Sequence, residues 1–377
     1  SRSARCTCCN ERMSLTARID LDAIAHNTRL LKRQAGDANL VCIVKADAYN
    51  HGVARCVPVM EANGADAFGV ATLAEAREVR ALTRLPVMCW LWDPSDDIPE
   101  GIELAAPTME HLIRLIDAPF TPTTYLKVET GMHRSGFDES AWDEVFALAA
   151  EAEQAGRIRV KGLMSHLAYA DNPQDPYTDT QAEQFRAAIN RGRAAGLELS
   201  CNHLANTAAT WTRPDLHFDQ VRPGVSLYGI DPIVGAGTGQ GASADKGLRP
   251  AMSWVADILA VKRIGKGDPV SYGLTWHAPH DGFTAVVPAG YADGVSRAWQ
   301  PHLQITVHGT RYPVVGRVCM DQMVIWLGAN EEGVTAGERA VIFGPGGMSA
   351  TELAGRIGTI DYEVLCSPKG RTRREYC

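Results

Sequence analysis

The sequence is poor in several features that would mark whole classes of protein. No apolar run approaches the roughly 18 residues that a membrane-spanning helix needs, so we expect no membrane partner. Lys and Arg number 37 against 44 Asp and Glu, a formal charge of −7. Nucleic-acid binders more often carry a basic face, so we expect no nucleic-acid partner. The opening residues lack the apolar stretch of a secretory signal, which favours a cytoplasmic location.

Cysteine is present but not in the pattern of a disulfide framework or a metal site. Six of the ten cysteines are scattered singly among apolar neighbours, as buried small hydrophobic residues would be: Cys42, Cys56, Cys89, Cys201, Cys319 and Cys366. Cys6, Cys8 and Cys9 cluster near the start, without a partner cluster at zinc-like spacing downstream. We therefore predict no metal, and a disordered N-terminal extension over residues 1–15.

The 377 residues, 45% hydrophobic and 21% charged, indicate a globular chain of about two domains. In the first part, apolar runs alternate with amphipathic stretches such as Leu73–Thr83, Ser140–Ala155 and Asp179–Ala195. We predict eight strands: Leu40–Val44, Ala67–Val70, Val87–Trp92, Ile102–Ala105, Thr124–Val128, Val160–Ser165, Leu199–Leu204 and Val221–Tyr228. This order predicts a (β/α)8 barrel over residues 16–248. A doubly wound open sheet is the alternative, although no GxGxxG follows the first strand.

The second part, residues 249–377, is predicted to be a mostly β domain. Its expected strands are Ser253–Arg263, Phe283–Pro288, Leu303–Val307, Tyr312–Cys319, Gln322–Leu327 and Arg339–Phe343, followed by one helix near Ala350–Ile357. The Gly- and Ser-rich run Gly235–Gly247 is typical of a linker or exposed loop.

Polar residues follow the predicted barrel strands, at the face where barrels carry their active sites. They comprise Lys45, Lys127, Glu129, Arg134, His166, His203, Asn206, Thr207, Arg222 and Gly224. Lys45 comes directly after four apolar residues, so its stem starts in the core. Desolvation depresses the pKa of a lysine, which Schiff-base chemistry requires.

The segment Val44–Gly52 resembles the pyridoxal-phosphate attachment signature of the alanine racemase family. Further segments resemble that family's motifs in the same order: Glu129–Gly136, His203–Asn206, Arg222–Gly229, Val270–Gly273, Gly290–Gly294, Gly316–Gln322 and Thr359–Glu363. Together they extend from about Thr16 to Tyr376. The resemblance implies an enzyme that interconverts L- and D-alanine, supplying D-alanine for bacterial peptidoglycan, with pyridoxal 5'-phosphate as cofactor.

The resemblance also implies the catalytic roles. Lys45 would become the N6-pyridoxal phosphate lysine and act as one of two acid/base groups. Tyr272 would act on the opposite face of the substrate, assisted by a hydrogen-bond chain through His166 to Arg222. Because an arginine can only donate, Arg222 would leave the ring nitrogen of the cofactor unprotonated.

The remaining implied residues bind the cofactor or the substrate. The cofactor would be held by Tyr49, His166, Asn206, Thr207, Arg222, Gly224, Val225 and Tyr362. The substrate would be recognised by Arg134, Met320, Tyr272, Tyr291 and Asp321. Lys127 matches a lysine that is carbamylated in many members, and N6-carboxylation would convert a cation facing Arg134 into an anion. Asn50 stands where the family usually has glycine, and asparagine tolerates left-handed backbone.

The family's second-domain residues reach the active site of the other subunit, which implies a head-to-tail homodimer with composite active sites. A racemase of serine, or of several amino acids, on the same fold is the alternative, because one methylene or hydroxyl is worth only about 1–3 kcal/mol in a pocket. A decarboxylase of this architecture would not need the second-face tyrosine. A small pyridoxal-phosphate carrier protein would lack the β domain, and a non-catalytic binding module would not need Lys45 and Tyr272 together.

Overall fold

The computed structural model describes residues 15–233 and 246–377, which form two units. One unit contains the described residues from Leu21 to Pro250. The other combines the strand that precedes Leu21 with Ala251–Cys377. Within the described ranges, no helix is both long and apolar enough to cross a membrane. The tail cysteines and most of the predicted loop Gly235–Gly247 lie outside the described residues.

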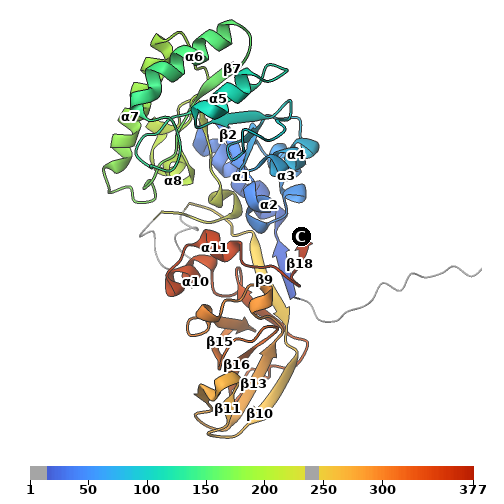
Figure 1. Ribbon diagram of the computed structural model, residues 1–377. Coiled ribbons are helices and arrows are strands. Elements are labelled where there is room, and N and C mark those ends of the chain that lie inside the picture. Colours follow the sequence, from blue (N-terminus) through green and yellow to red (C-terminus); the bar gives the residue numbers. More distant parts are fainter. Residues whose placement is uncertain (1–14, 234–245) are drawn as a thin grey trace, which may run out of the picture. The chain divides into compact units, whose positions relative to one another are not determined.

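The first unit is built on a parallel sheet with the strand order β7-β6-β5-β4-β3-β2-β8. Its strands are β2 (Asn39–Ile43), β3 (Ala67–Val70), β4 (Val87–Cys89), β5 (Glu103–Ala106), β6 (Thr123–Lys127), β7 (Arg159–Met164) and β8 (Gln220–Val221). The register runs in parallel, with Val41 opposite Ala67 and Phe68 opposite Val87. Near-continuous apolar strands need cover on their outer face, which the helices provide (Figure 1).

The covering helices are α1 (Leu21–Ala35), α3 (Val53–Ala62), α4 (Leu73–Leu82), α5 (Met109–Ile116), α6 (Trp142–Gln154), α7 (Tyr177–Ala194) and α8 (Thr207–Thr212). Helix α4 illustrates why they start where they do. The hydroxyl of Thr72 accepts the amide of Glu75, while the Glu75 carboxylate accepts the amide of Thr72. This capping box satisfies two donors that the first helical turn leaves free.

The sheet closes through a segment that is not a strand, which corrects one expectation. Leu199–Leu204 was predicted as the seventh strand but forms only an isolated bridge between His203 and Met164. On one side, the amides of Cys201 and His203 donate to carbonyls of β7. On the other side, the carbonyl of Asn202 accepts the amide of Asp219, just before β8. The (β/α)8 barrel is thus confirmed, with an irregular segment in place of one strand.

Glycine explains how closely this segment approaches β7. A Cβ at Gly162 of β7 would lie 1.7 Å from the carbonyl oxygen of Cys201. Any side chain there would push the segment off the sheet.

The predicted strand Val221–Tyr228 is also wrong over most of its length. Only Gln220–Val221 is extended, and Val225–Tyr228 forms the 3-10 helix η3. The turn is fixed from within the barrel, because the Tyr228 hydroxyl donates to the carbonyl of Ile43 at 2.9 Å.

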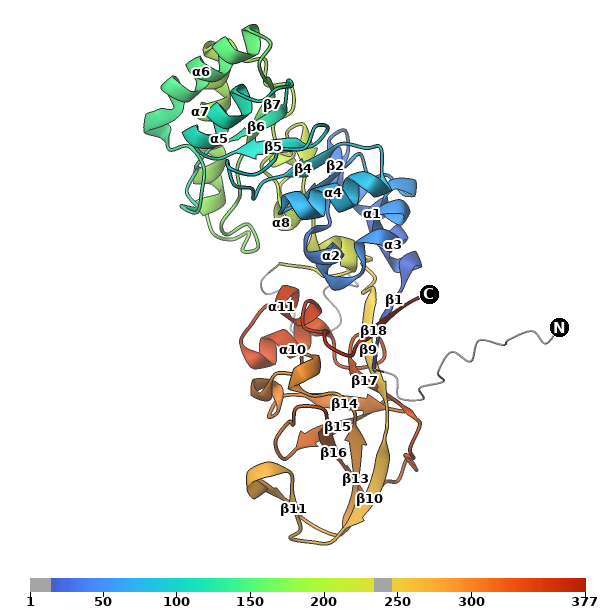
Figure 2. The same cartoon turned by 45° about the vertical axis from the view of Figure 1, so that its right-hand side comes forward.

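The second unit, called the β unit below, has a nine-stranded sheet in the order β10-β13-β16-β15-β14-β17-β9-β1-β18 (Figure 2). The strands are β1 (Leu15–Ile19), β9 (Met252–Asp257), β10 (Ala260–Ile264), β13 (Gly282–Val287), β14 (Gln304–Val307), β15 (Thr310–Val315), β16 (Met323–Gly328), β17 (Arg339–Phe343) and β18 (Arg373–Tyr376). A two-stranded sheet pairs β11 (Pro269–Val270) with β12 (Trp276–His277). Helices α10 (Ala350–Ile357) and α11 (Asp361–Leu365) complete the unit.

Several details of the β unit differ from the sequence expectation, and the strands β11, β12 and β18 were not predicted. The predicted strand Ser253–Arg263 is two strands, because Ile258 bonds to Glu338 beside β17 whereas Leu259 bonds to Val286 of β13. Helix α11 was not predicted. Strand β1, assigned by sequence to the barrel, pairs antiparallel with β9 and parallel with β18.

Candidate active site

Lys45 begins a left-handed turn at the end of β2. The next five residues, Ala46 to Asn50, all have positive φ, between 51° and 67°. Such a run is costly for residues other than glycine, so it needs external support. The Ala46 amide donates to Glu75 Oε1 at 2.8 Å, and the Val53 amide donates to Asp47 Oδ1 at 2.7 Å. The Glu75 carboxylate that caps α4 therefore also fixes the lysine turn, a role that the sequence analysis missed.

The Lys45 ammonium lies against an aromatic wall. Its Nζ is 5.8 Å from the centre of the Trp90 ring, on the segment that follows β4. A cation over an indole face is attracted by the ring's negative face. The lysine is thereby directed across the mouth of the barrel.

Tyr49, Thr207 and Gly224 meet at the same mouth. The Gly224 amide donates to Thr207 Oγ1 at 2.8 Å. A Cβ at Gly224 would lie 2.2 Å from the Tyr49 hydroxyl, so only glycine lets this phenol approach the backbone. The Tyr49 ring stacks on Tyr228 with 4.8 Å between centroids. Asn206 caps α8, its side chain accepting the Ala209 amide at 3.1 Å.

Arg222 is buried beneath this group and bonded on several sides. One guanidinium nitrogen donates to His203 Nδ1 at 2.6 Å and to the His203 carbonyl at 3.0 Å. The other donates to the Ser165 carbonyl at 2.6 Å and faces His166 Nδ1 at 3.4 Å. Burial lowers the pKa of Arg222 to about 10, so the side chain remains a cation at neutral pH.

Both histidines beside Arg222 are held neutral. Burial, followed by the charge of Arg222, lowers the pKa of His166 well below its usual value. The pKa of His203 falls for the same two reasons. Because Arg222 only donates, the ring nitrogen of His203 that faces it must be the acceptor. The sequence placed His203 at the mouth without a role, and the structure makes it a partner of Arg222.

Lys127 ends β6 as a largely buried amine. Its Nζ donates to Ser135 Oγ at 2.6 Å. Burial, and then the charges of Arg134 and Arg222, lower its pKa to about 8, against a smaller opposing effect of Glu129. The amine is therefore more easily deprotonated than an ordinary lysine. Arg134 itself is exposed in this chain.

A second group of predicted residues lies in the β unit. Tyr272 is 73% exposed, and Ser271 before it has a φ of 66°. This backbone is fixed by the Ser271 hydroxyl, which donates to the Arg317 carbonyl at 2.7 Å. A Cβ at Gly273 would lie 3.0 Å from the Arg317 guanidinium carbon, so this arginine packs directly on the Tyr272 turn.

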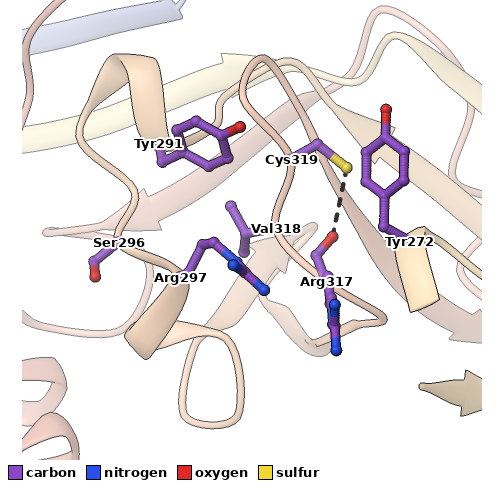
Figure 3. Close-up of a pocket in the computed structure, with 7 residues that line it drawn as sticks. All are labelled: Tyr272, Tyr291, Ser296, Arg297, Arg317, Val318 and Cys319. Carbon is purple, nitrogen blue, oxygen red and sulfur yellow. Dashed lines mark hydrogen bonds between the residues drawn. The ribbon is translucent and has the colours of Figure 1, made fainter. Parts of the chain in front are cut away.

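Tyr272 and Tyr291 border one pocket of about 440 Å³. Figure 3 shows Cys319 between the two tyrosines. The pocket is also lined by Ser296, Arg297, Arg317 and Val318. Two exposed phenols and two guanidinium groups thus share one concave surface.

Met320 and Asp321 lie beside this pocket on a loop locked to Tyr291. The Tyr291 amide donates to the Cys319 carbonyl, and the Ala292 amide to the Met320 carbonyl, both at 3.0 Å. The Asp321 carboxylate is engaged by Arg371 at 2.7 Å, and Arg371 also binds buried Asp293. Tyr362 lies on α11 of the same unit.

Both parts of the chain match family domains. The alanine racemase N-terminal domain matches residues 19–232, and the alanine racemase C-terminal domain matches residues 251–376. The chain belongs to the alanine racemase family. An alanine racemase of Corynebacterium efficiens is 58% identical over 370 residues, covering 96% of this chain and 98% of that protein. One of Mycobacterium tuberculosis is 40% identical, covering 96% and 95% respectively.

Solved structures of the alanine racemase family share the whole fold. The alanine racemase of Corynebacterium glutamicum has a TM-score of 0.86 at 47% identity, covering 97% of this chain and 99% of that one. The enzyme of Streptomyces coelicolor has a TM-score of 0.91 at 36% identity, covering 96% and 98%. Among the described residues, no group of three or more His, Cys, Asp or Glu could hold a metal ion.

Proposed function

We propose that this protein interconverts L-alanine and D-alanine in the bacterial cytoplasm, with pyridoxal 5'-phosphate as cofactor, and supplies D-alanine for peptidoglycan. The observation that carries the proposal is Lys45, presented by a supported left-handed turn within a chain that belongs to the alanine racemase family. The seven described cysteines are all free thiols, in keeping with a reducing compartment.

The barrel residues fit the cofactor. Lys45 would hold it covalently, and the cradle of Tyr49, Thr207 and Gly224 would receive its phosphate. The absence of a side chain at Gly224 supports this, because a Cβ there would close the cradle. Asn206 and the amide of Val225 would add donors, as would Tyr362 of the β unit, and His166 and Arg222 would lie at the ring. When bound, pyridoxal phosphate withdraws electrons from the amino acid and so acidifies its Cα–H bond.

Racemisation needs a proton removed from one face of Cα and another delivered to the opposite face. We assign the first face to Lys45 Nζ and the second to the phenol of Tyr272. A phenol, with a pKa of about 10, needs help to act as a base at neutral pH. Because Nδ1 of neutral His166 faces Arg222, its Nε2–H would be a donor that stabilises the phenolate, and Arg222 would remain a fixed donor towards the ring nitrogen of the cofactor.

Arg134 and the amide of Met320 would bind the substrate carboxylate, with Asp321 alongside. Carboxylation of Lys127 would place an anion where a cation now faces Arg134. Its pKa of about 8 supports this, since only the neutral amine reacts with CO2. Tyr291 and Tyr362 would narrow the entrance and exclude larger amino acids.

Tyr272 and Met320 are 73% and 52% exposed, although they would be needed at the substrate. We therefore propose a head-to-tail homodimer, in which these residues complete the active site of a second copy.

A chiral assay tests the proposal. The purified protein is supplied with pyridoxal phosphate and L-alanine, and D-alanine is measured by chiral chromatography, with L-serine in parallel. We expect D-alanine to form at a clearly higher kcat/KM than D-serine. Equal or faster formation of D-serine would favour the broader racemase, and absence of both products would reject the racemase proposal.

A further inference from the structure

Helix α7 reaches under two loops of the barrel mouth. One loop follows β6 and carries Arg134, and the other follows β7 and carries His166. Tyr177 and Gln181 are the residues of α7 that contact them. Because they are four positions apart, they lie on one face of the helix.

Gln181 bonds to both loops. It is fully buried, and its Oε1 accepts the Ala168 amide at 2.8 Å. Its Nε2 donates to the His166 carbonyl at 3.0 Å and to Thr130 Oγ1 at 3.3 Å. One amide side chain therefore fixes the His166 loop twice and the Arg134 loop once.

The two loops are also joined to each other at this point. Thr130 Oγ1 lies 2.7 Å from Ser165 Oγ, and both side chains are buried. The carbonyl of Ser165 accepts a bond from Arg222 at 2.6 Å. Gln181 is thus linked by hydrogen bonds through Thr130 and Ser165 to Arg222.

The side chain of Tyr177 bonds to the Arg134 loop. Its hydroxyl donates to the Gly131 carbonyl at 2.7 Å. A Cβ at position 131 would lie 2.7 Å from the same hydroxyl, so the contact requires glycine there. The Glu129 side chain holds this turn from the other side by accepting the amides of Gly131 and Met132.

We propose that Gln181 is a positioning residue that fixes the His166 loop and the Arg134 loop relative to each other, and that Tyr177 positions the Arg134 loop alone. The inference rests on the function proposed above, which gives His166 and Arg134 their roles. Displacement of a catalytic group by about 1 Å can lower the rate by about 10²-fold. A side chain that touches neither substrate nor cofactor can therefore strongly affect turnover.

Gln181→Met tests the inference, because it keeps the length of the side chain and removes all three hydrogen bonds. We expect kcat for alanine to fall by about 10- to 100-fold and KM to rise. The matched control is Phe185→Leu, one turn further along α7, where the ring packs on Phe218 with 5.1 Å between centroids. We expect the control to lower thermal stability but to leave both kinetic constants unchanged.

Hydrogen exchange gives a readout that does not depend on activity. In the cofactor-bound enzyme without alanine, exchange of the Ala168 amide should accelerate in Gln181→Met and not in Phe185→Leu. Tyr177→Phe, a milder variant, should raise KM several-fold while kcat stays within about twofold of wild type.

The inference is overturned if wild type racemises alanine but Gln181→Met matches Phe185→Leu in kcat, KM and Ala168 exchange. If Gln181→Met fails to fold, Tyr177→Phe decides, and an unchanged KM counts against the inference. If the wild-type protein forms no D-alanine, the proposed function is rejected instead. Exchange of the Ala168 amide still tests whether Gln181 holds the two loops.

Discussion

The two groups of candidate residues contrast in burial. In the barrel, Arg222 and Thr207 are 6% and 4% exposed and are hydrogen-bonded to their surroundings. In the β unit, Tyr272, Tyr291 and Met320 are largely exposed on a firmly bonded backbone. The barrel group is organised within one chain, whereas the β-unit group presents side chains outwards. Substitutions should therefore damage folding and activity together at the buried barrel residues but activity alone at the exposed residues of the β unit.

The largest effect is expected for Lys45→Ala, which removes the proposed attachment point and one proton carrier. Racemisation should fall by about 10⁴-fold or more, and the visible absorbance of the bound cofactor should be lost on dialysis. Lys32→Ala, which affects only an ion pair with Asp66, serves as the control. Retention of a tightly bound, absorbing cofactor by Lys45→Ala would reject the assignment.

Tyr272→Phe separates activity from folding most sharply. Loss of the phenolic proton should lower kcat by about 10² to 10⁴-fold. The melting temperature should change little, because within one chain the side chain is exposed and no described hydrogen bond of its hydroxyl is lost. Tyr169→Phe, at an exposed barrel tyrosine, should leave both properties unchanged. A drop in stability as large as in a buried variant would break the contrast.

Arg222→Met should show the opposite behaviour, with folding and activity impaired together. It removes the Arg222 donor from the buried carbonyl of Ser165 and one of two donors from the carbonyl of His203. The free energy of unfolding, from urea denaturation of the cofactor-free protein, should fall by roughly 3 kcal/mol. An unchanged unfolding free energy with lost activity would mean that Arg222 acts only on the cofactor.

Lys127→Met should give the smallest effect of these substitutions. The effect is a change in stability, and its size depends on pH. Since the folded-state pKa of Lys127 is about 8, below the ordinary value of 10.5, the charged amine disfavours folding below that pH. In CO2-free buffer the variant should be more stable than wild type near neutrality. The difference should shrink as the pH rises from about 8 towards 10.5. Denaturation midpoints at several pH values measure this, and a constant difference would contradict the assignment.

Local patterns in the sequence were sufficient for much of this fold. Apolar runs followed by polar residues identified β2, β6 and β7 and placed Lys45, Lys127 and His166 at their ends. The helix at Ala350–Ile357 was predicted with its observed bounds. These features depend on residues that are neighbours in the chain, so they can be recognised without a structure.

The features that escaped prediction depend on distant partners. The irregular segment before β8 packs closely on β7 because Gly162 has no side chain, and β1 joins the β unit because β9 and β18 lie on either side of it. The link from Glu75 to the lysine turn and from Gln181 to two loops also joins residues far apart in sequence. Nothing in the local composition of these segments signals such contacts.

The left-handed turn after Lys45 has a consequence for the order in which the protein folds. Local hydrogen bonds such as Gly52 N–H to the Asp47 carbonyl accompany a backbone conformation that is costly for five successive non-glycine residues, and Glu75 of α4 supports the turn from outside it. Residues 46–50 should therefore become ordered late, after β2 and α4 have docked, and contribute little to the folding barrier. In a nascent chain, Lys45 would reach its cofactor-binding position only once the barrel has formed. Incompletely folded molecules would therefore not bind the cofactor.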